Sequence, residues 1–167
     1  MTKPDVEQAA ADALERTLRD PYVQAFPETE AFWRASAKGQ LLLPRCRACS
    51  RWHWHPRAFC PFCHADALDW IEASGLGEVY SFSIVRRTGA PYVLAYVRLE
   101  EGPILMTNIV DTDLADVRVG MPVAVRFRAT EQGRMAPVCS APGPEPLVVF
   151  PHRNVPRDCS GVRSASQ

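Results

Sequence analysis

Four cysteines set as two pairs are the residues of this chain whose spacing is best suited to chemistry. Each pair has the form Cys-x-x-Cys, and ten residues separate the pairs, which are Cys46 with Cys49 and Cys60 with Cys63. Such spacing lets one tight turn aim two sulfur atoms at a single point, and the loop can return a second turn opposite the first. The pattern predicts a structural zinc ribbon, a closed tetrahedron of thiolates with no open position for water.

Two other metal sites stay open at this point. Four thiolates also suit iron in a rubredoxin-type site, and imidazole also binds zinc. Three histidines, His53, His55 and His64, lie inside or beside the cysteine pairs. Because four cysteines already complete a tetrahedron, we expect the cysteines to be the ligands and the histidines to be structural. A closed site of this kind stabilises the fold and does no chemistry.

The charge balance of the chain limits its partners. The 167 residues include 19 Lys and Arg and 19 Asp and Glu, so the formal net charge is zero. A neutral chain has no overall field that attracts nucleic acid or an anionic membrane, and we recognise neither a membrane-spanning run nor a leader. Metal-spaced thiols without a disulfide framework indicate a cytoplasmic protein. The remaining cysteines, Cys139 and Cys159, are expected to be a buried small residue and a tail thiol.

The first forty residues predict helices that lead into the ribbon. Residues 1–20 form a weakly amphipathic pattern that ends at Pro21, and its alanine-rich stripe needs another surface for stability. A second helix is expected over residues 29–38, with Phe32 and Trp33 as its large apolar side chains and Gly39 as its end. Residues 40–44 then predict a short strand before the first cysteine pair.

Beyond the ribbon the apolar residues alternate with a period of two, which is typical of strands. The pattern predicts strands near residues 79–84, 93–99, 104–110, 123–128 and 134–139. In the first of these strands, Tyr80, Phe82 and Ile84 are expected to share one face. Five strands of this length, joined by short turns, favour a small closed or partly closed barrel of the OB type.

The fold class is therefore mainly β: N-terminal helices and a four-cysteine zinc ribbon, followed by a five-stranded OB-type β-barrel and an extended C-terminal arm. We expect the boundaries 1–39 for the helices, 40–70 for the ribbon, 71–140 for the barrel and 141–167 for the arm. Five prolines interrupt the arm, which also carries an apolar stretch from Leu147 to Phe150. This stretch needs cover, either from the chain itself or from a partner subunit.

Several separated motifs resemble one family of bacterial and archaeal proteins. In chain order they are Phe32-Trp33, the two cysteine pairs, Pro56-Arg57, Trp70, Gly75 to Phe82 and Val119 to Val123. Over residues 28–140 the chain resembles the rubredoxin-like zinc-ribbon and OB-fold proteins that accompany thiolase-like enzymes. One departure is Cys139, since many relatives have an aromatic residue after a Pro-Val step near the end of the barrel.

The resemblance implies a non-catalytic accessory subunit of a thiolase-like acyl-CoA enzyme, either a thiolase, an aldolase or an acyltransferase that makes or breaks a carbon–carbon bond. The thiolase-like partner would form a hetero-oligomer with this chain, carry the chemistry and bind most of the CoA thioester. This chain would bind the partner and help to shape its CoA and substrate site. The residues agree, because Ser81 and Ser83 have no evident histidine and carboxylate companions and no other catalytic set stands out.

A patch of arginines and aromatic residues leaves a second function class open. Positive charge beside flat rings can pair with phosphate and stack on a base, so the patch could contact CoA or single-stranded nucleic acid. A one-electron iron carrier is the third class. Zero net charge counts against nucleic acid, and the plainer interpretation makes the rings a small ribbon core with solvated arginines. The patch comprises Arg45, Arg47, Arg51 and Arg57 with Trp52, His53, Trp54, His55 and Phe59.

Overall fold

The computed structural model describes residues 3–87 and 89–142, so the expected arm, its stretch from Leu147 to Phe150, and Cys159 lie outside the described residues. Helices come first: α1 (Lys3–Arg19), α2 (Pro21–Ala25), the 3-10 helix η1 (Pro27–Thr29) and α3 (Glu30–Ser36). The strands are β1 (Leu42–Cys46), β2 (Leu68–Glu72), β3 (Leu76–Val85), β4 (Tyr92–Leu99), β5 (Ile104–Ile109), β6 (Pro122–Ala129) and β7 (Met135–Ser140). None of the described helices is long and apolar enough to cross a membrane.

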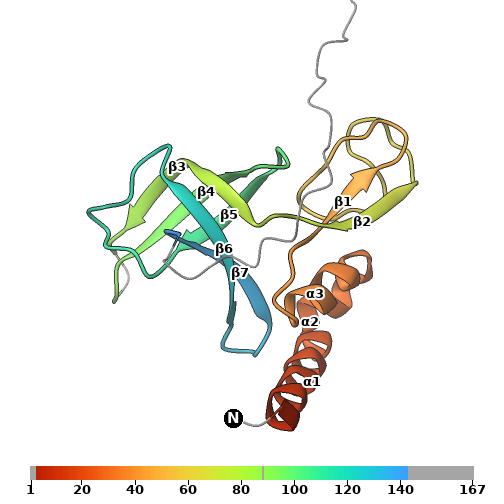
Figure 1. Ribbon diagram of the computed structural model, residues 1–167, viewed down its shortest axis with the longest axis horizontal. Coiled ribbons are helices and arrows are strands. Elements are labelled where there is room, and N and C mark those ends of the chain that lie inside the picture. The colour runs from red at the N-terminus through yellow and green to blue at the C-terminus, as the bar shows by residue number, and fades with distance from the viewer. Residues whose placement is uncertain (1–2, 88, 143–167) are drawn as a thin grey trace, which may run out of the picture.

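Five of the strands close into a barrel in the order β3-β4-β5-β7-β6, with β6 pairing back onto β3. The β5–β7 pair is parallel and the other neighbours are antiparallel. Alternate side chains of β4 fill the barrel interior from Val93 to Leu99, as the period-two pattern requires. Figure 1 shows the barrel on one side and the helices with β1 and β2 on the other. The predicted mainly β fold, with helices, ribbon and five-stranded barrel, is confirmed.

The first barrel strand differs from the expected pattern. Its register against β4 shifts between Val79 and Ser81, which marks a β-bulge at Tyr80. As a result Val79 is buried and Tyr80 is 50% exposed, while Phe82 and Ile84 pack against the core. The expectation that Tyr80 shares a face with Phe82 and Ile84 is therefore wrong, because an inserted residue changes the phase of the alternation.

The N-terminal helices pack on the barrel through the turn before β7. Pro21 ends α1 as expected, but it also begins α2, whose N-cap Asp20 accepts a hydrogen bond of 2.8 Å from the Tyr22 backbone N–H. Arg134 forms a 2.9 Å ion pair with Asp20, and its guanidinium lies 4.9 Å from the ring centroids of both Tyr22 and Trp33. The chain itself thus supplies a surface for these helices.

The ribbon is built on a small two-stranded sheet. Strand β2, which the sequence pattern did not predict, pairs antiparallel with β1 from Leu42 opposite Glu72 to Cys46 opposite Leu68. The ring of Trp54 from the ribbon loop lies 5.0 Å from that of Phe32 in α3. The ribbon therefore packs against the helices, and this contact fixes its position beside the barrel.

Candidate metal centre

Two similar turns present the four cysteines. Cys46 is the last residue of β1, and its carbonyl accepts a hydrogen bond of 2.9 Å from the Ser50 N–H; in the second turn the Cys60 carbonyl accepts one of 3.0 Å from the His64 N–H. Ser50 and His64, each directly after a cysteine pair, have φ values of 58° and 62°. Because neither residue is glycine, the sequence carries no clear signal for these left-handed positions.

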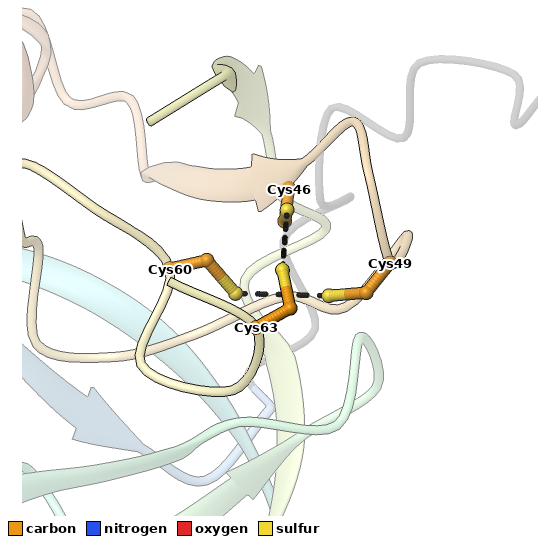
Figure 2. A group of neighbouring side chains, drawn as sticks. All are labelled: Cys46, Cys49, Cys60 and Cys63. Carbon is orange, nitrogen blue, oxygen red and sulfur yellow. Dashed lines mark hydrogen bonds between the residues drawn. The ribbon is translucent and has the colours of Figure 1, made fainter. Parts of the chain in front are cut away.

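All four sulfur atoms converge on one point. They lie within 4.8 Å of one another, and Figure 2 shows the four side chains pointing toward a common centre. The sulfur of Cys46 lies 3.5 Å from that of Cys63, and the sulfur of Cys49 lies 3.6 Å from that of Cys60. A tetrahedral zinc with Zn–S bonds of about 2.3 Å needs sulfur separations of about 3.8 Å. The four free thiols are therefore placed as the ligands of one metal ion with four sulfur ligands would be.

Proton affinities within the cluster are unequal. Burial raises the pKa of the Cys60 thiol, but the backbone N–H groups of Phe62 and Cys63 and the thiols nearby outweigh it and lower the pKa to about 7. At Cys63 the Ala65 backbone N–H lowers the pKa, yet the surrounding thiols and burial raise it to about 12. One thiol thus ionises readily and another resists, because hydrogen bonds among the thiols favour the ionised form at Cys60 and the protonated form at Cys63. A divalent cation at the centre would favour the ionised form of every thiol that binds it.

The nearby histidines are placed as structural residues. His53 is buried, and its Nδ1 lies 3.4 Å from the His55 carbonyl oxygen, while His64 is exposed. Burial is the main cause that lowers the pKa of His53 and of His55. Among the described residues, the group able to hold a metal contains the four cysteines and no histidine.

The arginines and rings near the ribbon are divided between its core and its surface. Trp52 and Trp54 are half-buried and pack against the core, and the Arg45 guanidinium lies 5.9 Å from the Trp52 ring centroid. Arg47 pairs with Asp69 at 3.4 Å. The two tryptophans agree with the plainer interpretation of a small ribbon core, whereas Phe59 is 53% exposed and lies on the surface.

Cys139, the departure from the family pattern, lies inside the barrel. It is fully buried on β7, opposite Ile109 of β5. Burial raises the pKa of its thiol to about 12, and a hydrogen bond with Thr107 opposes that shift. Cys139 is therefore the buried small residue that the sequence predicts.

Comparison with known proteins identifies the family. Adjacent segments match two family models, the ChsH2 rubredoxin-like zinc ribbon domain over residues 33–69 and the ChsH2 C-terminal OB-fold domain over residues 70–128. A "DUF35 domain-containing scaffold protein" of Methanocaldococcus jannaschii is 36% identical over 108 residues, which cover 60% of this chain and 77% of that protein. The chain belongs to the DUF35 family. The resemblance inferred from the motifs is thereby confirmed.

Other relatives differ in length. The "Probable enoyl-CoA hydratase alpha subunit" of Thermomonospora curvata is 34% identical over 120 residues, which cover 68% of this chain but only 38% of that protein. A DUF35 scaffold protein of Methanothermobacter thermautotrophicus is 31% identical over 113 residues, which cover 63% of this chain and 85% of that protein. This chain thus matches most of one relative and little more than a third of the other.

Solved structures agree with the DUF35 assignment. The "Ltp2-ChsH2(DUF35) aldolase" has a chain that matches with a TM-score of 0.62 and 30% identity, over 68% of this chain and 94% of that one. A Sulfolobus solfataricus DUF35 protein described as having unknown function matches with a TM-score of 0.52 and 16% identity, over 82% of this chain and 94% of that one, which shows the shared fold alone.

Proposed function

We propose that this DUF35 chain is a non-catalytic accessory subunit of a thiolase-like acyl-CoA enzyme. The observation that carries the proposal is its likeness to the DUF35 chain of the Ltp2-ChsH2 aldolase, which extends over 94% of that chain at 30% identity. The archaeal relatives named as scaffold proteins support the same role. In this role the chain forms a hetero-oligomer with a thiolase-like subunit, which carries the chemistry.

The metal centre contributes structure to this role. We propose that Cys46, Cys49, Cys60 and Cys63 bind one zinc ion, because four converging thiols and a closed geometry match a structural site. A bound zinc supplies a fixed link between the two turns of the ribbon. The chain's own residues do the rest: β1 leads into the first turn, β2 follows the second and pairs with β1, and Trp54 packs the ribbon loop on α3.

The finer assignments belong to the same proposal. The partner is a thiolase, an aldolase or an acyltransferase, and it binds most of the CoA thioester, while the DUF35 chain helps to shape the CoA and substrate site. The boundaries 1–39, 40–70, 71–140 and 141–167 and a cytoplasmic location complete the proposal. Whether the complex makes or breaks a carbon–carbon bond depends on the pocket of the partner.

Reconstitution tests the accessory role. The complex is purified from the native host, its thiolase-like subunit is identified by mass spectrometry, and both subunits are then expressed separately. We expect no acyl-CoA turnover by this chain alone and full turnover by the recombined pair. Turnover by the isolated chain at the rate of the complex would contradict the proposal, as would the absence of any thiolase-like protein that binds it.

A further inference from the structure

Three neighbouring barrel strands expose apolar side chains on the same outer face. Tyr80 of β3, Tyr96 of β4, and Ile104 and Met106 of β5 are 50%, 47%, 38% and 56% exposed, and we call them the outer β3–β5 face. Tyr96 lies directly opposite Met106 across the strand pair. A hollow of about 460 Å³ opens between Tyr80, Ser81, Tyr96 and Ile104.

Local contacts hold the aromatic part of this face in place. The bulge in β3 turns Tyr80 outward, and the guanidinium of Arg98 lies 4.7 Å from the centroid of its ring. Arg98 also pairs with Glu78 at 3.6 Å. A ring that is already oriented loses little conformational freedom on binding, so the hollow is preorganised for an incoming side chain.

We propose that the outer β3–β5 face is the anchor site for the thiolase-like subunit, which inserts an apolar side chain into the hollow. The proposal rests on the proposed function and names the surface that performs it. Tyrosine, methionine and arginine are enriched at protein interfaces, where binding energy concentrates on anchors that fill pockets. The charges of Glu78 and Arg98 offset each other, so the face complements a neutral apolar surface better than a polyanion.

The size of the face favours a larger partner over a second copy of this chain. Three strands spaced about 4.8 Å apart give a face only about 10 Å wide. A two-fold contact through this face alone would bury much less than the roughly 1,000 Å² that a specific interface needs. A thiolase-like subunit can extend the contact beyond the face and use the hollow as its central anchor.

The rate of methionine oxidation measures whether another molecule covers the outer β3–β5 face. Met106 is 56% exposed on the face, whereas Met121 is 5% exposed and provides a matched buried control. In the isolated zinc-loaded chain, peroxide should convert Met106 to the sulfoxide much faster than Met121, as measured by peptide mass spectrometry. In the reconstituted complex we expect the Met106 rate to fall at least about tenfold, with Met121 unchanged.

Slow oxidation of Met106 in the isolated chain would overturn the proposal, because the face would already be covered. If dilution then made Met106 oxidise faster, a second copy of the chain would be what covers the face. If deletion of residues 143–167 made it oxidise faster, the chain's own C-terminal segment would be what covers it. An unchanged Met106 rate in the complex would also overturn the proposal.

Substitutions test the same face by affinity. Tyr96→Glu and Met106→Glu place a charge on the face without touching the barrel interior, and each should weaken binding of the recombinant thiolase-like subunit at least about tenfold. Val119→Glu is the control, because Val119 is 64% exposed on the connection between β5 and β6, and it should bind as the unchanged chain does. Circular dichroism and zinc content confirm that each variant is folded.

The binding outcomes separate the two proposals. Normal binding by the unchanged chain and by both face variants would overturn the anchor site and leave the accessory function standing. Equal weakening by Val119→Glu would overturn the anchor site as well, since the effect would not be specific to the face. Absence of binding by the unchanged chain would overturn the accessory function, and the anchor site with it.

Discussion

The four cysteines differ in burial although they converge on one point. Cys46 and Cys60 are buried, Cys49 is half-buried and Cys63 is exposed. The spacing of the pairs was enough to predict this convergence, because each Cys-x-x-Cys turn fixes two sulfur positions locally. The left-handed residues that close the turns, Ser50 and His64, could not be predicted, because their conformation depends on the completed ribbon.

Replacing one buried ligand tests the metal site. Cys60→Ser should abolish zinc binding and unfold the ribbon while the barrel stays at least partly folded, because metal binding supplies folding free energy on the order of 10 kcal/mol. Metal analysis measures the first effect, and the tryptophan fluorescence, to which Trp52 and Trp54 of the ribbon contribute, measures the second. Cys139→Ala is the matched control and should keep zinc, because Cys139 lies inside the barrel. Retention of zinc by Cys60→Ser, or a red iron protein from the unchanged chain, would refute the assignment.

His53 should make the stability of the ribbon depend on pH. Burial lowers the pKa of this side chain below its usual 6.5, and its buried Nε2 has no hydrogen-bond partner among the described residues. The folded chain therefore holds His53 neutral, while the unfolded chain takes up a proton near pH 6.5. The contribution to stability is complete above that pH and is lost as the pH falls through the lowered pKa.

Urea unfolding of the zinc-loaded chain at about pH 8 and at about pH 5.5 measures this effect. His53→Gln should reduce the loss of stability between the two conditions, and zinc release followed in the same samples separates the effect from acid dissociation of the metal. The lowered pKa of His55 leaves a residual slope in the variant. An identical pH dependence in both proteins would show that His53 does not contribute.

At the scale of elements, periodicity located α1, α3 and the five barrel strands, but it missed the short helices α2 and η1 that follow Asp20. It missed β2, which is short and has only intermediate and exposed side chains. It also missed the bulge at Tyr80, since an inserted residue becomes visible only through pairing with β4. The exposed face that depends on Tyr80 was therefore beyond the reach of pattern analysis, while the barrel behind it was not.

Close packing of β3 on β4 at Gly77 predicts a strong preference for glycine. A Cβ at this position would lie 2.4 Å from the Arg98 carbonyl oxygen, so the backbone would have to move. We expect Gly77→Ala to destabilise the fold by about 1–3 kcal/mol in urea unfolding. Gly89→Ala is the control, because a Cβ at Gly89 meets nothing within 4 Å. If the two variants unfolded at the same urea concentration, close packing at Gly77 would not explain a need for glycine there.

Arg134 should stabilise the packing of the N-terminal helices against the barrel. Arg134→Ala removes the ion pair with Asp20, which is 5% exposed, and the ring contacts with Tyr22 and Trp33. We expect a loss of about 2 kcal/mol, because the buried carboxylate keeps only its hydrogen bond from the backbone. Hydrogen exchange in α1 and α2 should accelerate.

Two variants make the Arg134 experiment specific. Arg19→Ala removes an exposed ion pair within α1 and should have little effect on exchange or stability. Asp20→Asn combined with Arg134→Ala should cost less than the two single changes added together, because the pair is coupled. Strict additivity would show that the ion pair is not what holds the helices.

At the scale of the whole molecule, helices, ribbon and barrel share one hydrophobic core. The cluster joins Phe32 of α3 and Leu43 of β1 to Val79 and Leu105 inside the barrel. The metal centre can therefore influence the barrel through packing. The family resemblance could predict this order of parts, because the order is carried by motifs. It could not predict the contact between Arg134 and the helices, which joins residues far apart in the chain.

The closed barrel has a consequence for how recognition can change over time. Strand β4 lies in the middle of the sheet and pairs with β3 on one side and β5 on the other along most of its length, so its main chain offers no open edge for an incoming chain to extend. On the outer face around β4, partner choice therefore falls to outward side chains. Those side chains can be replaced without altering the backbone that carries them. One barrel frame can thus be fitted to different partner surfaces by a handful of surface substitutions.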